Sequence, residues 1–323
     1  MLEARMLMQI NMLALRNSDH ICKIIDIINL PEYSSLGMVL QKGACSLLDY
    51  MEANSMTAVD PRYIQPIIYQ ILTAVCSLNE YEIVHVDIKP ENILFKSSTK
   101  FYSYTEDGKK KIELGDPQIM LCDFNCSMQF SNMREPRGIC QTFHYRSPEV
   151  VLGTNDWREI DVFSIGAIMA ELASGHLLFD MEEKNEPSPT LQQRAQHLRL
   201  FEIELGECPE SLLQDSVFEF FSSGEWREYL PPPSASNNTK FQLWRTLALQ
   251  SKRRKAILEA IDGMLTWPTT RHTAETAMQL PFFTARKNVS PRCHDNMVQI
   301  QPHDFVRVNG QLHSDEMYLG EDY

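Results

Sequence analysis

The chain has 323 residues and a formal net charge of −13, from 43 acidic and 30 basic side chains. This charge argues against a nucleic-acid surface and weakly favours basic partners, unless the acidity serves solubility alone. No uncharged apolar run approaches the length of a membrane span, since the best candidate, residues 162–179, contains Glu171 and His176. The eight cysteines show no CxxC pair, so reduced thiols in a cytoplasmic or nuclear protein are expected.

The beginning of the chain predicts one helix, two strands and a second helix. Residues 1–13 have the pattern of an amphipathic helix. Its apolar side is formed by Leu2, Met6, Ile10 and Leu13. Residues 22–26 and 37–41 are typical of short strands, with turn-forming residues between them. Asp60 and Pro61 mark the start of a helix whose apolar positions recur every three or four residues.

The rest of the chain is mainly helical. Residues 96–117 are polar and contain turn formers, which indicates a surface insertion, and residues 119–124 form a short buried strand. Further helices are predicted over residues 158–174 and around residues 257–265. Residues 285–323 show little periodicity and predict a flexible tail. A small α+β part followed by a helical part indicates an α+β protein.

The stretch HVDIKPENIL, residues 85–94, carries the strongest chemical signal. The Asp87 carboxylate could accept a proton from a hydroxyl, and Lys89 could balance the charge of a moving phosphoryl group. The amide oxygen of Asn92 and the carboxylate of Asp123 are ligands suited to a hard cation. Phosphoryl transfer needs positioning and charge stabilisation rather than covalent chemistry, and these side chains suit that task.

These residues, with others further along the chain, resemble the protein kinase family. One such motif alone would be weak, whereas several in the same order and at sensible separations make a chance match improbable. The motifs are residues 85–92 for the catalytic loop, 122–125 for the metal-binding motif, 147–149 for the end of the activation segment, 161–166 for the helix below the catalytic loop, and Arg271 in the last helix.

The subgroup can be narrowed further. HYRSPEV at residues 144–150 and QHLRLFEIELG at residues 196–206 are similar to the CDC-like (LAMMER) and SR-protein kinases of the CMGC group. Val86, which precedes the aspartate of the catalytic loop, is a non-arginine residue of a kind also found in that subgroup. Lys89 suits a serine/threonine kinase, and the resemblance covers about residues 1–284.

The resemblance assigns the chemistry of transfer to a few residues. Asp87 would be the catalytic base or the group that orients the hydroxyl, and Lys89 would contact the γ-phosphate. Thr142 would support both of them. Asn92 and Asp123 would hold Mg²⁺.

The resemblance also assigns the binding site for ATP. Leu40, Gln41 and Lys42 would form the hinge beside adenine, with Leu94 beneath the ring. Glu3 matches the glutamate that pairs with a strand lysine in kinases. The residues with structural roles in this family are Glu3, His85, Phe124, Glu149, Asp161 and Arg271.

The expected fold is kinase-like, with a truncated small lobe of one helix and two strands on a complete, mainly helical large lobe. The small lobe is expected over residues 1–43, the large lobe over residues 44–284 and the tail over residues 285–323. The expected substrate is a basic or Arg/Ser-rich protein, without direct nucleic-acid or membrane binding, and the chain is expected to be a monomer.

The glycine-rich loop and strand lysine of kinases do not occur ahead of Glu3 in this sequence. Losing one charge-stabilising donor reduces a rate roughly a thousandfold, so the isolated chain is expected to be a poor catalyst. The sequence leaves two alternatives open: a pseudokinase that binds partners as a scaffold, or a fragment of a longer active kinase.

Overall fold

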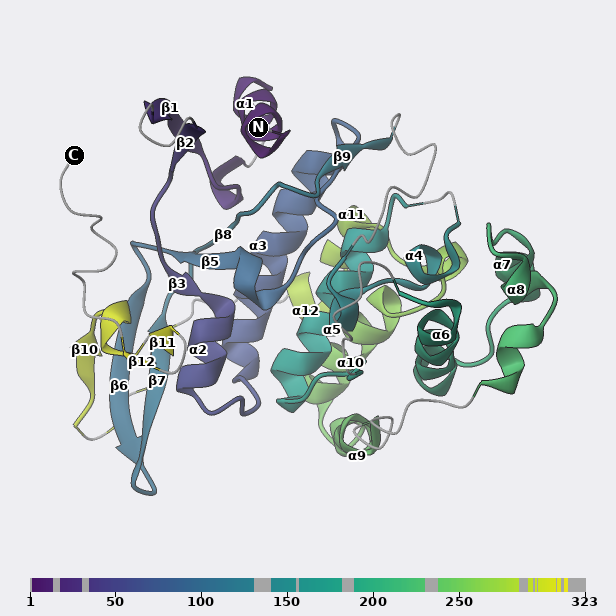
Figure 1. The fold of residues 1–323 in the computed structure, drawn as a ribbon. Coiled ribbons are helices and arrows are strands. Elements are labelled where there is room, and N and C mark those ends of the chain that lie inside the picture. Colours follow the sequence, from purple (N-terminus) through teal and green to yellow (C-terminus); the bar gives the residue numbers. More distant parts are fainter. Residues whose placement is uncertain are drawn as a thin grey trace.

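A small N-terminal part lies on a larger, mainly helical part (Figure 1). This arrangement confirms the predicted α+β, kinase-like fold. The computed structural model describes residues 2–13, 18–30, 35–130, 141–154, 157–181, 189–229, 238–284, 290–292, 294, 296–305, 307–308 and 311–312.

The small part consists of α1 (Leu2–Met12), β1 (Ile24–Leu30) and β2 (Ser35–Leu40), the predicted helix and two strands. The strands form an antiparallel ribbon. Of the residues predicted on the apolar side of α1, Ile10 is buried, and Met6 and Leu13 are half-buried and pack against the core. Ala4 and Leu7 are buried as well, so the buried face is broader than the predicted one.

A three-stranded sheet lies between the small part and the helices, with β5 between β3 and β8. The capping box of Ser46 and Asp49 starts the next helix, where the Asp49 carboxylate accepts from the Ser46 amide at 2.7 Å. The Asp60 side chain caps the long helix behind the sheet, as the sequence predicted. The elements are β3 (Gly43–Ser46), α2 (Leu47–Ala53), α3 (Pro61–Asn79), β5 (Ile93–Lys96) and β8 (Ile119–Leu121).

The predicted surface insertion is an antiparallel hairpin of β6 (Lys100–Glu106) and β7 (Lys109–Gly115). Contrary to the expectation of a flexible tail over residues 285–323, a later segment forms β10 (Val298–Ile300) along the edge of β6 (Figure 1). The lack of periodicity hid this strand, because three residues at a sheet edge are too few to show an alternating pattern.

Side-chain contacts also fix the C-terminal segment to the rest of the protein. The rings of His294 and Tyr104 stack with centroids 3.8 Å apart, and those of Phe305 and Phe101 lie 5.3 Å apart. The short elements that follow β10 are a 3-10 helix (Pro302–Asp304), β11 (Arg307–Val308) and β12 (Gln311–Leu312).

The helical part is organised around α5 (Ile160–Ser174), in which nearly every side chain is buried. Gly175 ends this helix with φ +77, and a Cβ there would lie 2.8 Å from the Ala58 amide nitrogen, so only glycine fits without strain. No helix in the described part of the chain is long and apolar enough to cross a membrane. The remaining elements are β4 (Ile83–Val84), β9 (Met128–Gln129), α4 (Pro148–Leu152), α6 (Leu191–Leu205), α7 (Glu210–Gln214), α8 (Glu219–Ser222), α9 (Asn238–Ala248), α10 (Lys252–Met264), α11 (Ala274–Met278) and α12 (Pro281–Thr284).

Candidate active site

The loop that follows β4 is held from below by Asp161, at the start of α5. The Asp161 carboxylate accepts from the backbone amides of His85 at 2.7 Å and Val86 at 2.9 Å. Asp161 is fully buried, and burial raises its pKa. Val86 adopts φ +76, a conformation that β-branched residues rarely take, so these two bonds hold the loop in a shape it would not otherwise prefer.

The Asp87 carboxylate is the centre of a hydrogen-bonded cluster. Its Oδ1 accepts from the Thr142 hydroxyl at 2.7 Å and from the Thr142 amide at 3.0 Å. Its Oδ2 lies 3.0 Å from Lys89 Nζ, which also donates to Thr142 Oγ1 at 3.1 Å. The structure therefore brings together the three residues that the sequence assigned to transfer.

The surroundings of Asp87 determine its charge. Burial by itself raises the pKa of Asp87, but the hydrogen bonds from Thr142 and Lys89 and the charge of Lys89 together lower it below the ordinary value. Burial by itself lowers the pKa of Lys89. The hydrogen bond to Asp87 and the negative charge of nearby carboxylates outweigh burial, so the pKa of Lys89 is above its ordinary value. Asp87 and Lys89 are thus both charged at neutral pH, and each holds the other in place.

Asn92 and Asp123 present oxygens that suit a hard cation. Asn92 Nδ2 donates to the Asp87 carbonyl oxygen at 2.9 Å, which orients the amide. Asp123 Oδ1 accepts from Asn125 Nδ2 at 2.9 Å. In the part of the chain that the structure describes, Asn92 Oδ1 and Asp123 Oδ2 accept no hydrogen bond, so both oxygens are available. The donor set fits Mg²⁺, which commonly uses one or two protein oxygens together with substrate phosphates.

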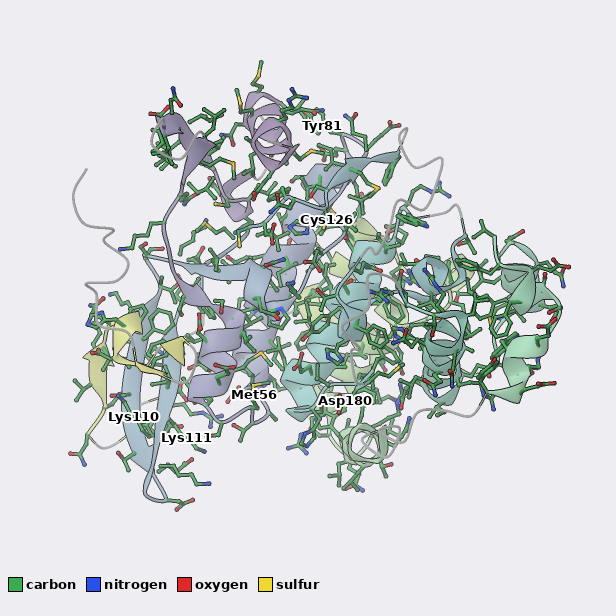
Figure 2. All side chains as sticks on the ribbon, viewed as in Figure 1. Met56, Tyr81, Lys110, Lys111, Cys126 and Asp180 are labelled. Carbon is green, nitrogen blue, oxygen red and sulfur yellow. The ribbon has the colours of Figure 1, made fainter. Side chains whose placement is uncertain are left out.

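The segment that carries Asp123 is hydrogen-bonded to the loop that carries Asp87, since the Cys122 amide donates to the Asn92 carbonyl oxygen at 3.0 Å. Burial raises the pKa of the Cys126 thiol first, and the charges of Asp87 and Asp123 raise it further. Both carboxylates also raise the pKa of Lys89. Cys126 lies just beyond β8, below α1 and near β9 (Figure 2). Among the described residues, no group of three or more His, Cys, Asp or Glu could hold a metal by itself.

Glu3 connects the small part to the metal-binding motif. Its carboxylate is buried and accepts from the backbone amide of Phe124 at 3.3 Å. The Phe124 ring packs on the ring of His85, with centroids 4.7 Å apart, and His85 Nε2 lies 3.0 Å from the Cys122 carbonyl oxygen. These contacts tie α1, the residues after β8 and the loop after β4 into one unit.

Two of the four residues predicted beside adenine, Lys42 and Leu94, line one cavity. The Gln41 amide donates to the Lys23 carbonyl oxygen at 2.8 Å, which holds the segment after β2 against the start of β1. Lys42 and Leu94 line a cavity of about 850 Å³, which Leu40 and Gln41 do not line. Leu94 lies on β5, opposite Ser46 of β3.

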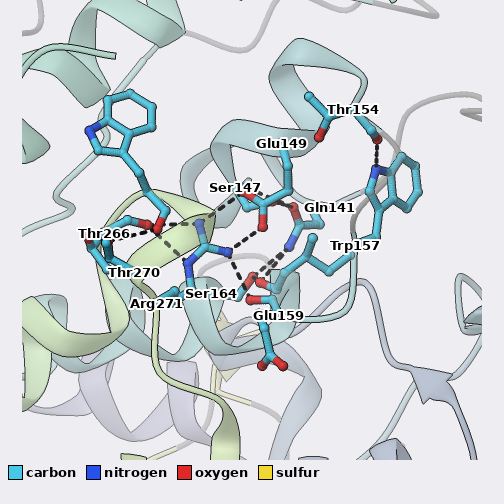
Figure 3. Close-up of polar contacts among 12 residues, drawn as sticks. Gln141, Ser147, Glu149, Thr154, Trp157, Glu159, Ser164, Thr266, Thr270 and Arg271 are labelled. Carbon is cyan, nitrogen blue, oxygen red and sulfur yellow. Dashed lines mark hydrogen bonds and ion pairs between the residues drawn. The ribbon is translucent and has the colours of Figure 1, made fainter. Parts of the chain in front are cut away.

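Glu149 and Arg271 form the predicted ion pair, and both side chains are almost completely buried (Figure 3). Arg271 Nη2 donates to Glu149 Oε2 at 3.0 Å, and Arg271 Nη1 donates to the other carboxylate oxygen. Arg271 also donates to the backbone oxygens of Glu159 and Thr266 at 3.0 and 2.9 Å. Because these bonds satisfy the buried charges, the pair fixes the end of the activation segment to the base of the large part.

Gln141 is a structural residue that the sequence interpretation missed. Its side chain donates to Ser164 Oγ at 2.9 Å and accepts from the Ser147 amide at 2.8 Å (Figure 3). Its backbone has φ +64, and it directly precedes Thr142. A glutamine has no distinctive signal in a sequence, and only its position next to Thr142 could have drawn attention to it.

Comparisons with known proteins agree with this geometry. The family model described as "Protein kinase domain" matches residues 1–283. A serine/threonine-protein kinase AFC1 from Arabidopsis thaliana is 30% identical over 293 residues, covering 83% of this chain and 58% of the relative. The human dual specificity protein kinase CLK4 is 25% identical over 273 residues, covering 83% of this chain and 51% of the relative.

A solved structure shows the same fold. The crystal structure of a kinase domain superposes with a TM-score of 0.65 at 22% identity, covering 87% of this chain and 82% of that one. The chain spans between about half and three-fifths of the length of these two curated relatives.

Proposed function

Because the chain belongs to the protein kinase family, and among its relatives resembles the CDC-like kinases, we propose that it transfers the γ-phosphate of ATP to serine or threonine hydroxyls. The observation that supports this most is the cluster of Asp87, Lys89 and Thr142, in which a charged carboxylate is held next to a cation. Asn92 donates to the carbonyl oxygen and the carboxylate of Asp87 at 2.9 and 3.3 Å, and its own backbone carbonyl oxygen accepts from the amide of Cys122, the neighbour of Asp123, at 3.0 Å.

Asp87 is the acceptor for the substrate hydroxyl in this proposal. Thr142 supplies two hydrogen bonds to Oδ1, whereas Oδ2 contacts Lys89 Nζ at 3.0 Å and Asn92 Nδ2 at 3.3 Å. A hydroxyl hydrogen-bonded to this carboxylate is oriented for attack on phosphorus. Lys89 stabilises negative charge on the transferred group, since its ammonium is partly exposed beside Asp87 and can reach a phosphate oxygen.

Asn92 and Asp123 would hold Mg²⁺. When bound, the ion would neutralise phosphate charge. The residues themselves are prepared for this role: Asp87 fixes the amide of Asn92, and Asn125 fixes one oxygen of Asp123. The segment Leu40–Lys42 and Leu94 would receive the adenine.

We expect the activity of the isolated chain to be low. Glu3 is buried, yet in the described ranges no lysine or arginine lies within ion-pair distance of its carboxylate. In the kinases that this chain resembles, the matching glutamate pairs with a lysine that contacts the phosphates of ATP. Loss of one charge-stabilising donor of that kind reduces a rate roughly a thousandfold.

A radiolabelled phosphotransfer assay on the purified chain with a generic basic protein tests this proposal. Wild type should show weak, magnesium-dependent transfer, and Asp87→Asn should lower it by about a hundredfold or more, because general base catalysis contributes roughly 10²–10⁴. Glu207→Gln is the matched control, since Glu207 is exposed and does not contribute to the electrostatics of Asp87 or Lys89. Equal transfer by wild type and Asp87→Asn would contradict the assignment.

A second candidate function is a scaffold that binds partners without transferring phosphate. This alternative is favoured because, among the described residues, no lysine or arginine forms an ion pair with Glu3. Thermal unfolding with Mg-ATP separates the two candidates. Stabilisation that disappears in Asp123→Ala supports a working nucleotide site, and no stabilisation together with no transfer supports the scaffold.

The substrate class and setting follow from charge and similarity. A net charge of −13 favours a basic substrate, and the similarity to CLK and AFC kinases is the reason to expect Arg/Ser-rich sequences. We further propose a monomer that acts in the cytoplasm or nucleus. A peptide array would contradict the substrate class if acidic peptides were phosphorylated better than Arg/Ser-rich ones.

A further inference from the structure

Gln141, the residue directly before Thr142, holds its backbone in an unusual conformation. Its φ is +64, and the residue is buried, with 5% of its surface exposed. Residues other than glycine rarely adopt this left-handed conformation, which persists only where the surrounding structure holds it. The contacts of Gln141 itself therefore have to stabilise this turn of the chain.

The side-chain amide of Gln141 uses both of its ends. Its Nε2 donates to Ser164 Oγ at 2.9 Å and to the Ile160 carbonyl oxygen at 3.2 Å, and both acceptors belong to α5. Its Oε1 accepts from the Ser147 amide at 2.8 Å and from the Ser147 hydroxyl at 3.1 Å, just before α4 (Figure 3). Partners at both ends fix the orientation of the amide and use both of its N–H groups. The side chain thus clamps residue 141 between the start of α4 and α5.

The backbone carbonyl group of Gln141 is fixed as well. Its oxygen accepts from Arg146 Nη2 at 2.9 Å and from Arg146 Nε at 3.3 Å. This carbonyl group and the N–H group of Thr142 belong to the same planar peptide unit, so the direction of one determines the direction of the other. The N–H group of Thr142 donates to Asp87 Oδ1 at 3.0 Å. Holding Gln141 therefore aims the amide of Thr142 at the proposed acceptor of the substrate proton.

Both sides of this contact are anchored at the start of α5. Ile160 and Asp161 are the first two residues of that helix. The Ile160 carbonyl oxygen accepts from Gln141, and the Asp161 carboxylate accepts from the two backbone amides that precede Asp87. Because a helix is a rigid support for a site, its first turn holds the segment of Thr142 and the loop of Asp87 in one common frame.

We infer that Gln141 is a positioning residue for the proposed phosphotransfer: its side-chain amide orients Thr142, and through Thr142 it orients the carboxylate of Asp87. The inference rests on the proposed function, since this orientation affects the rate only if Asp87 receives the substrate hydroxyl. The side chain of Gln141 reaches α5 and the residue before α4 rather than the Asp87 cluster. Gln141 therefore acts on the reaction through Thr142.

The amide resonance of Thr142 in the full chain, labelled with isotopic threonine, tests this positioning without relying on activity. Thr142→Val identifies the resonance by its loss, and Asp87→Ala shows where the resonance lies once the carboxylate is removed. Gln141→Met keeps a long unbranched side chain but removes the four hydrogen bonds of the amide. This variant should move the Thr142 resonance toward its position in Asp87→Ala, because the hydrogen bond to a charged oxygen is weakened.

Gln70→Met is the matched control, because Gln70 is also buried and has the same kinds of partner. Its Nε2 donates to two backbone carbonyl oxygens at 2.8 Å, and its Oε1 accepts from a backbone amide at 3.1 Å. Both variants should lose stability, whereas only Gln141→Met should move the Thr142 resonance. Should Gln141→Met fail to fold, Ser164→Ala removes one acceptor of the Gln141 amide and should move the resonance in the same direction by less.

Kinetics test whether this positioning serves transfer. Gln141→Met should lower kcat roughly tenfold to a hundredfold with KM little changed, since a misplacement of about 1 Å can cost a hundredfold. Gln70→Met should keep the wild-type kcat. An unmoved Thr142 resonance in folded Gln141→Met or, failing that, in Ser164→Ala would overturn the inference, and so would a moved resonance with wild-type kcat. Absence of transfer in the wild type would contradict the proposed function instead, and the resonance would still decide whether Gln141 orients Thr142.

Discussion

The base of the candidate active site and the ribbon of β1 and β2 show opposite ways of building a functional site. Beneath the loop after β4, Asp161 and the pair of Glu149 and Arg271 are fully buried, and each has several hydrogen-bond partners. In the ribbon, Ile25 is 67% exposed and Leu36 is 48% exposed. Two-stranded ribbons have little stability of their own. The ribbon therefore depends on contacts such as the hydrogen bond from the Cys22 amide to the Leu121 carbonyl oxygen, at 2.8 Å.

The residues proposed for transfer and those proposed for nucleotide binding are therefore supported unequally by the surrounding structure. The geometry around Asp87 is determined by a rigid, densely bonded base. The α1–β1–β2 part meets the metal-binding motif through the bond between Glu3 and the Phe124 amide. Four sets of variants test whether the base and the ribbon really differ in this way.

The largest effect is expected from Arg271→Leu. The change leaves the Glu149 carboxylate buried without its partner, which should lower the free energy of unfolding by about 3–5 kcal/mol. Denaturant unfolding measures it. Lys111→Met, which removes an exposed pair with Glu106 on the hairpin, is the control and should have a far smaller effect (Figure 2). Similar losses for the two variants would mean that the base is not specially rigid.

Glu171 should make the stability of the base depend on pH. Burial raises the pKa of Glu171 to about 7, although the bond from the Tyr145 hydroxyl at 2.8 Å favours the charged form. The folded protein therefore holds a proton that the unfolded chain releases near the ordinary glutamate pKa of 4.5. The stabilising contribution is complete below that value and is lost as pH rises through about 7.

Glu171→Gln removes this dependence while keeping an acceptor for Tyr145. Relative to the variant, wild type should lose about 3 kcal/mol of unfolding free energy between pH 4.5 and pH 8. Unfolding curves at several pH values test the difference. The exposed residue Glu207 provides the control, and Glu207→Gln should follow wild type throughout. If the difference in unfolding free energy between wild type and Glu171→Gln were the same at every pH, Glu171 would not titrate as expected.

Thr142→Val tests how the base orients Asp87. The variant loses the hydrogen bond that the Thr142 hydroxyl donates to Asp87 and the one that it accepts from Lys89. It keeps the hydrogen bond from its backbone amide to Asp87 at 3.0 Å. Hydrogen bonds to charged groups contribute about 1.5–3 kcal/mol, so kcat should fall between roughly tenfold and a hundredfold with KM little changed. Loss of a donor raises the pKa of Asp87, so the acidic limb of the pH–rate profile should move to higher pH. Thr142→Ser should restore most of the rate, and a purely structural role would leave the pH profile unmoved.

The smallest effect is expected in the ribbon. Ile25→Ser should change the unfolding free energy by less than about 0.5 kcal/mol, because the side chain is largely in water. Ile21→Ala, just before the ribbon and only 1% exposed, should cost about 2–4 kcal/mol. A large loss in Ile25→Ser would show that something covers the ribbon in solution.

Much of the site could be predicted from the chain because its residues are close in sequence. Asp87, Lys89 and Asn92 lie within one short loop, and a loop of fixed length constrains their separation. The helices α3 and α5 could be predicted from their apolar spacing and from end signals such as Asp60 and Gly175. Gln141 could not be found, since its partners Ser147 and Ser164 come from separate elements.

The amino-acid sequence was enough to predict the family and several of the helices and strands, and to nominate the groups proposed to transfer phosphate, because local spacing and side-chain chemistry are properties of the chain. The charge and orientation of those groups became visible only in the folded protein. The lowered pKa of Asp87 depends on Thr142 and Lys89, and one of these lies in a distant segment. Folding likewise placed β10 on β6 and so created the cavity, because a sheet edge is completed by any strand that reaches it, however distant in sequence.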